Sequence, residues 1–208
     1  MSGTALTERQ LTDLLRESVG GQVGVLQNGY LKDLSSEVAA LAQLRRGAGK
    51  APQDVPELWG MTGTERLFSA GELRNRDAGR AEAAMFLAVT LYALHQQSKA
   101  DPMHRPGIEL GTAVRRLMTA TGDDESVRQR FVRVGLAATP DVLAYRLREL
   151  VSLLRRHSVP LDYALLAERL YQAQLPGRMS EVRQKWGLSF HRSAAQREDS
   201  SPTTDKDA

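Results

Sequence analysis

Apolar residues recur at helical spacing along almost the whole chain, and this repeat constrains the fold more than any other feature. It is clearest over residues 140–156, where Leu143, Leu147, Leu150 and Leu154 follow at intervals of three or four positions. This spacing places the side chains on one face of an α-helix, which has about 3.6 residues per turn. No segment shows the strict alternation of a half-buried β-strand. The sequence therefore predicts an all-α protein, a compact bundle of about eight helices.

Glycines and prolines divide this pattern into elements. Gly47 is typical of a residue that ends a helix, and the glycine-rich run over 20–30 predicts a connector. Residues 50–77 predict an irregular segment, in which a turn over 56–61 packs Trp59 onto the core. We expect helices over about 7–19, 34–46, 78–97, 108–120, 125–136 and 140–157, then one that begins near Pro160 and a last one that carries Val182, Trp186 and Phe190.

One helical domain is expected to occupy residues 1–192. Its N-terminal half reaches about residue 100 and its C-terminal half covers 101–192. The two halves form either one bundle or two half-bundles that share a core. Residues 193–208 hold four acids and two bases among small polar residues, so we expect them to form a disordered tail.

The composition limits the classes of protein and of site. The chain has no cysteine, which excludes disulfides, thiolate metal sites and a cysteine nucleophile. Its first residues are polar, unlike a secretory signal. The most apolar run, residues 83–94, is shorter than the roughly 20 residues that span a bilayer. We therefore expect a cytoplasmic protein without a membrane partner.

Arginine dominates the positive charge of the chain. There are 28 Lys and Arg against 25 Asp and Glu, and without residues 193–208 the balance is 26 to 21. Of the 28 basic residues, 23 are arginine. Arginine can bind phosphate through two parallel hydrogen bonds, so this composition suits a nucleic-acid partner. The excess of arginine could also result from the codon usage of a GC-rich genome. Composition alone does not distinguish this explanation from nucleic-acid binding.

No residue pattern indicates catalysis, a metal site or a cofactor. The four histidines lack metal-ligand spacing. The stretch Gly47–Lys50 lacks the GxxxxGK[ST] pattern of a phosphate-binding loop, and Ala51 stands where that pattern needs Ser or Thr. Asp123, Asp124 and Glu125 stand where acids cap a helix and interact favourably with its dipole. Capping explains them better than Mg²⁺ binding does.

Arginines recur on the flanks of the apolar stripes. In the helix expected over 140–157, Arg148 and Arg155 lie seven positions apart and share one exposed face. Ion pairs with acids four positions away are the ordinary explanation of a charged helix face. Here, however, the acids gather at helix starts and the arginines in helix middles and ends. We therefore expect a basic groove that binds phosphates without reading bases.

Several segments between residues 35 and 192 occur in an order that is characteristic of one family. They read LAQLRRGAGKAP, PELW, AAMFLAVTLYALHQQ, LGTAVRRLM, RFVRVGLAAT, LRELVSLLRRHSVPLDYALLAERL and VRQKWGLSFHR. This order resembles the CasB family, the small subunit of the type I-E CRISPR surveillance complex Cascade. The resemblance implies an all-helical, non-catalytic protein that binds the other Cascade subunits, namely the backbone subunits that carry the guide RNA and the large subunit, and a second copy of itself. Its basic surface would hold guide RNA and target DNA, chiefly the strand displaced in the R-loop.

The resemblance also implies nucleic-acid-binding positions, although whether each contacts DNA, guide RNA or a neighbouring subunit stays open. Trp59, Trp186 and Phe190 could stack on bases, but the spacing of the last two favours the core. The family's basic positions match Arg45, Arg46, Arg115, Arg116, Arg130, Arg133, Arg148, Arg155 and Arg156, with Lys50 as an accessory position.

A helical DNA-binding transcriptional regulator is the alternative. It requires a helix-turn-helix with base-reading polar residues at the start of a helix. The nearest candidate, HSVPLDYALLAERL, has Pro160, Leu161 and Tyr163 there, which suits packing better than base contacts. A nuclease that holds Mg²⁺ through Asp123 and Asp124 is a third hypothesis.

Overall fold

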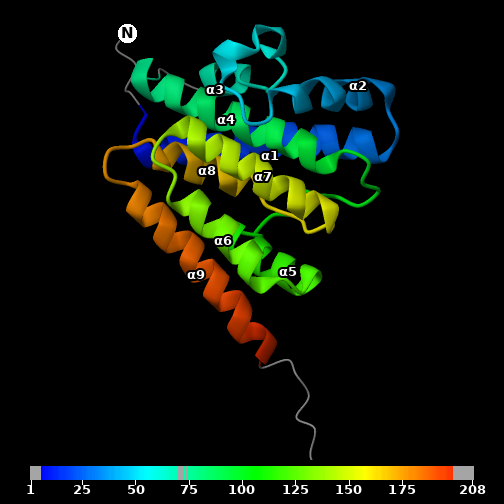
Figure 1. Cartoon of the computed structure of the whole chain (residues 1–208). Coiled ribbons are helices and arrows are strands. Elements are labelled where there is room, and N and C mark those ends of the chain that lie inside the picture. Colours follow the sequence, from blue (N-terminus) through cyan, green and yellow to red (C-terminus); the bar gives the residue numbers. More distant parts are fainter. Residues whose placement is uncertain (1–5, 70–72, 74, 199–208) are drawn as a thin grey trace, which may run out of the picture.

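The computed structural model describes residues 6–69, 73 and 75–198. Within these ranges the chain folds into nine α-helices and three short 3₁₀ helices, with a single isolated β-bridge and no strand. The prediction of an all-α bundle is confirmed (Figure 1). The helix beyond the expected eight is α3, which lies inside the segment predicted to be irregular. In chain order the elements are α1 (Glu8–Leu31), α2 (Ser35–Leu44), η1 (Arg45–Gly47), η2 (Pro52–Asp54), η3 (Pro56–Leu58), α3 (Glu65–Ser69), α4 (Asn75–Gln96), α5 (Leu110–Thr121), α6 (Asp124–Gly135), α7 (Pro140–Arg156), α8 (Tyr163–Ala173) and α9 (Met179–Glu198).

α1 runs without a break through the glycine-rich segment, so the connector predicted over 20–30 is wrong. Each glycine weakens an isolated helix by about 1 kcal/mol relative to alanine. Packing compensates, because Gly20 lies against Ala164 of α8 and Gly21 against the side chain of Arg66. The buried residues of α1 recur at nearly every turn of the helix and include Leu11, Leu15, Val19, Val23 and Leu26.

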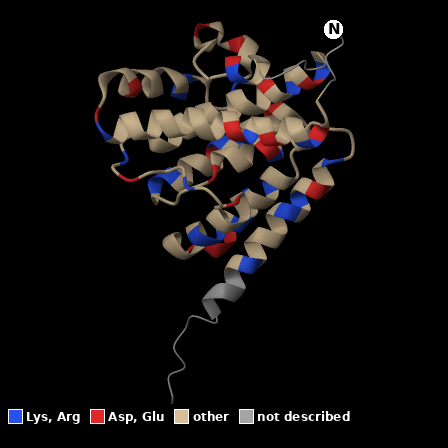
Figure 2. Ribbon diagram, turned by 180° about the vertical axis from the view of Figure 1, so that it is seen from behind, with Lys and Arg blue, Asp and Glu red and all other residues tan. Residues whose placement is uncertain are grey.

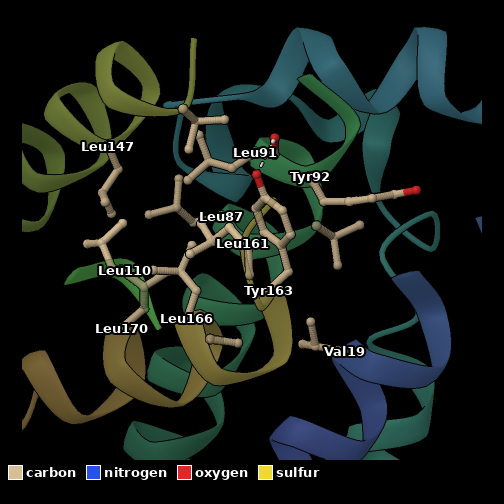
Figure 3. Close-up of a cluster of buried hydrophobic side chains, with 14 of the residues drawn as sticks. Val19, Leu87, Leu91, Tyr92, Leu110, Leu147, Leu161, Tyr163, Leu166 and Leu170 are labelled. Carbon is tan, nitrogen blue, oxygen red and sulfur yellow. Dashed lines mark hydrogen bonds between the residues drawn. The ribbon is translucent and has the colours of Figure 1, made fainter. Parts of the chain in front are cut away.

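α4 forms the centre of the core. Every residue from Ala84 to Ala93 is buried, because α1, α2, α7 and α8 all pack against this helix. Tyr163 of α8 points into the same core, where its hydroxyl lies 3.5 Å from the Leu91 carbonyl (Figure 3). The same hydroxyl lies 2.7 Å from Nδ1 of His95. A single cluster of buried residues includes members from both halves of the chain.

α9 crosses α5 at a glycine. A Cβ atom on Gly111 would lie 2.6 Å from the backbone nitrogen of Phe190 and closer still to the carbonyl of Trp186. Only glycine therefore allows the two backbones to approach this closely. Val182 and Trp186 are buried at this contact, as their spacing predicts, and Phe190 is half-buried.

Polar side chains cap the starts of four described helices, and Thr7 caps α1. The side chains of Asp123, Thr139 and Asp162 each accept a hydrogen bond from a backbone N–H three residues ahead, at the starts of α6, α7 and α8. Capping thus accounts for Asp123, as predicted. α8 begins at Tyr163 instead of near Pro160, because Asp162 and not the proline supplies the cap.

Gly47 is needed for packing and does not end α2. The helix ends at Leu44 and continues as the 3₁₀ turn η1. A Cβ atom on Gly47 would lie 2.7 Å from the side chain of Leu58 and 2.9 Å from that of Phe86. The left-handed residue that reverses the chain is Gly49, with a φ of 80°.

The predicted burial of Trp59 is wrong. The short turn exists as η3, but Leu58 enters the core with 1% exposure while Trp59 is 64% exposed. Trp59 is the extended residue that follows the turn, so its side chain leaves the buried face. Its indole Nε1 donates a hydrogen bond to the Pro52 carbonyl at 3.0 Å.

α9 continues to Glu198, so the expected boundary at 192 falls inside a helix. Residues 199–208 of the expected tail lie outside the described residues. Among the helices of the described ranges, none combines the length and the apolar character needed to cross a membrane.

Candidate nucleic-acid interface

The ten predicted cations form no ion pair with any residue that the structure describes. Most of them are exposed, and Arg115, Arg130 and Arg155 are half-buried. In the part of the chain that the structure describes, salt bridges engage a different set of arginines: Arg16, Arg80, Arg128, Arg146, Arg169 and Arg178. None of the ten belongs to this set, so their charges remain available to an external anion.

In both α6 and α7, paired and unpaired arginines occur on the same helix. In α6, Arg128 pairs with Glu125 at 2.9 Å, whereas Arg130 and Arg133 have no acidic partner among the described residues. In α7, Arg146 pairs with its neighbour Glu149 in the same way, whereas Arg148, Arg155 and Arg156 stay unpaired within the described ranges. The acids thus neutralise the arginines near them and leave the others uncompensated.

The turn after α2 packs against α7 and brings cations from distant parts of the sequence together. Gly49 lies directly against the side chain of Arg148, since a Cβ atom on it would be 3.0 Å from Cδ of that arginine. Arg45 and Gln97 line a common cavity of about 140 Å³, and Gln97 accepts a hydrogen bond from Nη1 of Arg155 at 3.0 Å. We call Arg45, Lys50, Arg148 and Arg155 the turn–α7 group.

Lys99 extends the turn–α7 group, and sequence reasoning missed it. Its Nζ donates to the hydroxyl of Ser158, just beyond the end of α7, at 2.9 Å. A single lysine in a connector carries no helical pattern, so only the approach of this connector to α7 reveals it.

The positive charges of this region act on the pKa of the nearby His95. Burial is the main cause that lowers the pKa of its imidazole to about 3, and the charges of Lys99 and Arg155 contribute to the same lowering. Because the neutral ring bonds to the Tyr163 hydroxyl inside the core, this histidine is structural.

Four of the predicted cations lie on α5 and α6, two helices that pack against each other and against α7. The guanidinium of Arg115 lies 5.7 Å from the centroid of the Phe190 ring, which itself stacks on Phe131 at 5.8 Å. Arg130 and Arg133 are on α6, which packs against α7, the helix that carries Arg148 and Arg155. Figure 2 shows basic residues on several helices with acidic ones between them.

The aromatic residues divide between core and surface. Trp186 is 1% exposed and the ring of Phe190 packs between elements, which agrees with the core assignment from their spacing. Trp59 is the exception, because its indole is exposed.

In the described part of the chain, packing, capping and pairing account for most of the residues considered for the alternative functions. Tyr163 and Leu161, at the start of the proposed recognition helix, are fully buried and could not reach a DNA groove. No group of three acids or histidines within the described ranges could hold a metal ion, and Glu125 pairs with Arg128. The remaining candidate is the set of unpaired cations.

The comparisons with known proteins place the chain in one family. Residues 40–191 match the family described as CRISPR-associated protein Cse2. The crystal structure of CasB from Thermobifida fusca shares 47% sequence identity with a TM-score of 0.77, over 86% of this chain and 98% of that one. CasB from Thermus thermophilus shares 25% identity, with a TM-score of 0.56 over 91% and 99% of the two chains. A chain of a structure described as a CRISPR RNA-guided surveillance complex has a TM-score of 0.67 at 22% identity, over 88% and 98%. A comparison with curated proteins gave no match. The chain belongs to the Cse2 (CasB) family of CRISPR-associated proteins.

Proposed function

We propose that this protein is the non-catalytic small subunit of a type I-E Cascade complex and binds nucleic-acid backbone there. Its partners would be the backbone and large subunits, a second copy of itself, the guide RNA and the target DNA. The observation that carries this proposal is the set of ten predicted cations without ion pairs in the described part of a Cse2-family fold.

Phosphate binding by these side chains would suit the energetics of R-loop formation. The RNA–DNA hybrid is about as stable as the DNA duplex that it replaces, so the exchange is nearly balanced. A few additional phosphate contacts to the hybrid or to the displaced strand would shift this balance. The start of α8, which is the nearest candidate for a recognition helix, is buried, so these arginines would bind phosphates of any sequence.

Co-expression with the other Cascade proteins of the same organism tests the assignment. We expect the chain to co-purify with them, to increase the lifetime of an R-loop on a matched target, and to show no nucleolytic activity alone. A chain that purifies apart from these proteins would refute the proposal. Mg²⁺-dependent cleavage by the chain alone would also refute it.

A further inference from the structure

The segment that follows the basic turn carries the opposite charge. Residues 52–65 contain Asp54, Glu57 and Glu65 and no lysine or arginine. In Figure 1 this region stands with α3 at the upper edge of the bundle, away from α5, α6 and α9. A surface of this charge repels the phosphates that the cations attract.

A cavity opens in this acidic region between two exposed aromatic side chains. Its volume is about 390 Å³, within the range of roughly 300–1,000 Å³ that is typical of ligand pockets. Trp59 is 64% exposed and Phe68 is 49% exposed, and both line it. The buried side chains of Leu58 and Phe86 also contribute to its wall. We call this the Trp59 cavity.

The indole of Trp59 is held in place even though it is exposed. Its Nε1 donates to the Pro52 carbonyl at 3.0 Å, which fixes the ring against η2. A large aromatic side chain that is fixed and exposed is typical of an interface anchor.

Two carboxylates complete the lining of the cavity. Glu65 and Glu82 both line it, and neither forms a salt bridge or a side-chain hydrogen bond within the described ranges. Glu82 is half-buried, so its charge is partly removed from water without compensation. A bound cation would provide that compensation.

We propose that the Trp59 cavity binds an arginine or lysine side chain presented by a neighbouring protein. A cation is attracted to the face of an aromatic ring, most strongly to tryptophan. The carboxylates of Glu65 and Glu82 would pair with its charge, and the stem of the side chain would pack on Phe68. A nucleobase could also stack on Trp59, but the phosphates beside it would face these acids. The proposal rests on the proposed function only in that the neighbour is another protein of the same complex.

The first test uses the isolated full-length chain and a small probe. The indole N–H signal of Trp59 is followed by NMR during titration with Nα-acetyl-arginine amide, and Trp59→Phe identifies the signal by its loss. Nα-acetyl-citrulline amide is the neutral control of matched shape. We expect the arginine probe alone to shift the signal, and Glu65→Gln/Glu82→Gln to abolish the shift. No shift with arginine, or an equal shift with citrulline, would overturn the proposal.

The second test measures the affinity of the chain for the other Cascade proteins. Trp59→Ala should weaken it by roughly two- to thirtyfold, the range of a single cation–π contact. Glu65→Lys/Glu82→Lys should weaken it further, whereas Asp13→Lys/Glu17→Lys, the same charge change on the exposed face of α1, should not. Unchanged affinity in both cavity variants would contradict the proposal.

The outcomes also separate this proposal from the alternatives. If Trp59→Ala instead weakens DNA binding and the lysine variants strengthen it, the cavity stacks bases and the protein partner is refuted. If the chain does not assemble with Cascade proteins but the arginine probe still shifts the Trp59 signal, the proposed function is refuted. The proposal that the cavity binds a cationic side chain then still stands.

Discussion

At the scale of single residues, the glycines of this protein have different roles that their identity does not reveal. Gly111 permits a backbone contact between α5 and α9, whereas Gly187, also in α9, has no atom near the position of a Cβ. Only the three-dimensional neighbours distinguish them. The sequence shows two glycines in helical patterns and nothing more.

Alanine at these two positions should therefore have opposite effects. Gly111→Ala should destabilise the protein by about 1–3 kcal/mol, because backbone atoms of α9 cannot yield easily. Gly187→Ala should stabilise it by about 0.5–1 kcal/mol, because alanine favours the helix. Urea denaturation measures both changes. Equal effects of the two substitutions would show that α5 and α9 do not cross at Gly111.

The buried His95 makes stability depend on pH. Its folded-state pKa of about 3 lies below the ordinary value of 6.5, so the unfolded chain binds a proton more readily. The depressed pKa contributes fully to the free energy of unfolding above about pH 6.5. As the pH falls towards 3, this contribution is lost by up to about 1.4 kcal/mol per pH unit. Urea unfolding between pH 7 and pH 5 should show the loss, and His95→Gln should flatten it. An identical pH slope in the variant would contradict the assignment.

At the scale of elements, the sequence predicts helices well where apolar spacing and caps agree. α6 and α7 begin within one residue of the predicted starts, because their caps at Asp123 and Thr139 are local signals. The glycines after residue 19 predict a break by local propensity. The helix continues because α1 has buried residues both before and after these glycines. The prediction for Trp59 fails because the turn ends at Leu58. Leu58 is therefore buried, and the extended Trp59 after it is exposed.

The continuity of α1 can be tested at Gly24, which lies in the segment predicted to be a connector. No neighbouring atom would meet a Cβ there, so Gly24→Ala should stabilise the protein by about 0.5–1 kcal/mol. The control is Gly107, which is equally unobstructed but has a φ of 82°. Gly107→Ala should destabilise by about 1 kcal/mol or more, because the backbone strain remains. Destabilisation by Gly24→Ala would indicate that the glycine-rich segment is not helical.

At the scale of the whole molecule, the notable feature is the separation of paired from unpaired charge. The sequence alone does not predict that the turn at Gly49 lies against helix α7, because the two are about a hundred positions apart along the chain. What the sequence did contain was the asymmetry of the charges, with acids at helix starts and arginines beyond them. The structure adds which arginines find partners among the described residues, and it brings four of the predicted cations together as the turn–α7 group.

The salt dependence of R-loop binding tests the central claim most directly. Arg148→Gln/Arg155→Gln removes two unpaired charges, and Arg128→Gln/Arg146→Gln removes two paired ones, so the net charge changes equally. The affinity of the assembled complex for an R-loop is measured over a series of salt concentrations. Each phosphate contact contributes about 0.7 to 0.9 to the slope of log affinity against log salt. We predict that the first variant lowers the slope by about 1.4–1.8 and that the second leaves it unchanged. Equal slopes in both variants and the unaltered protein would contradict phosphate binding by the unpaired arginines.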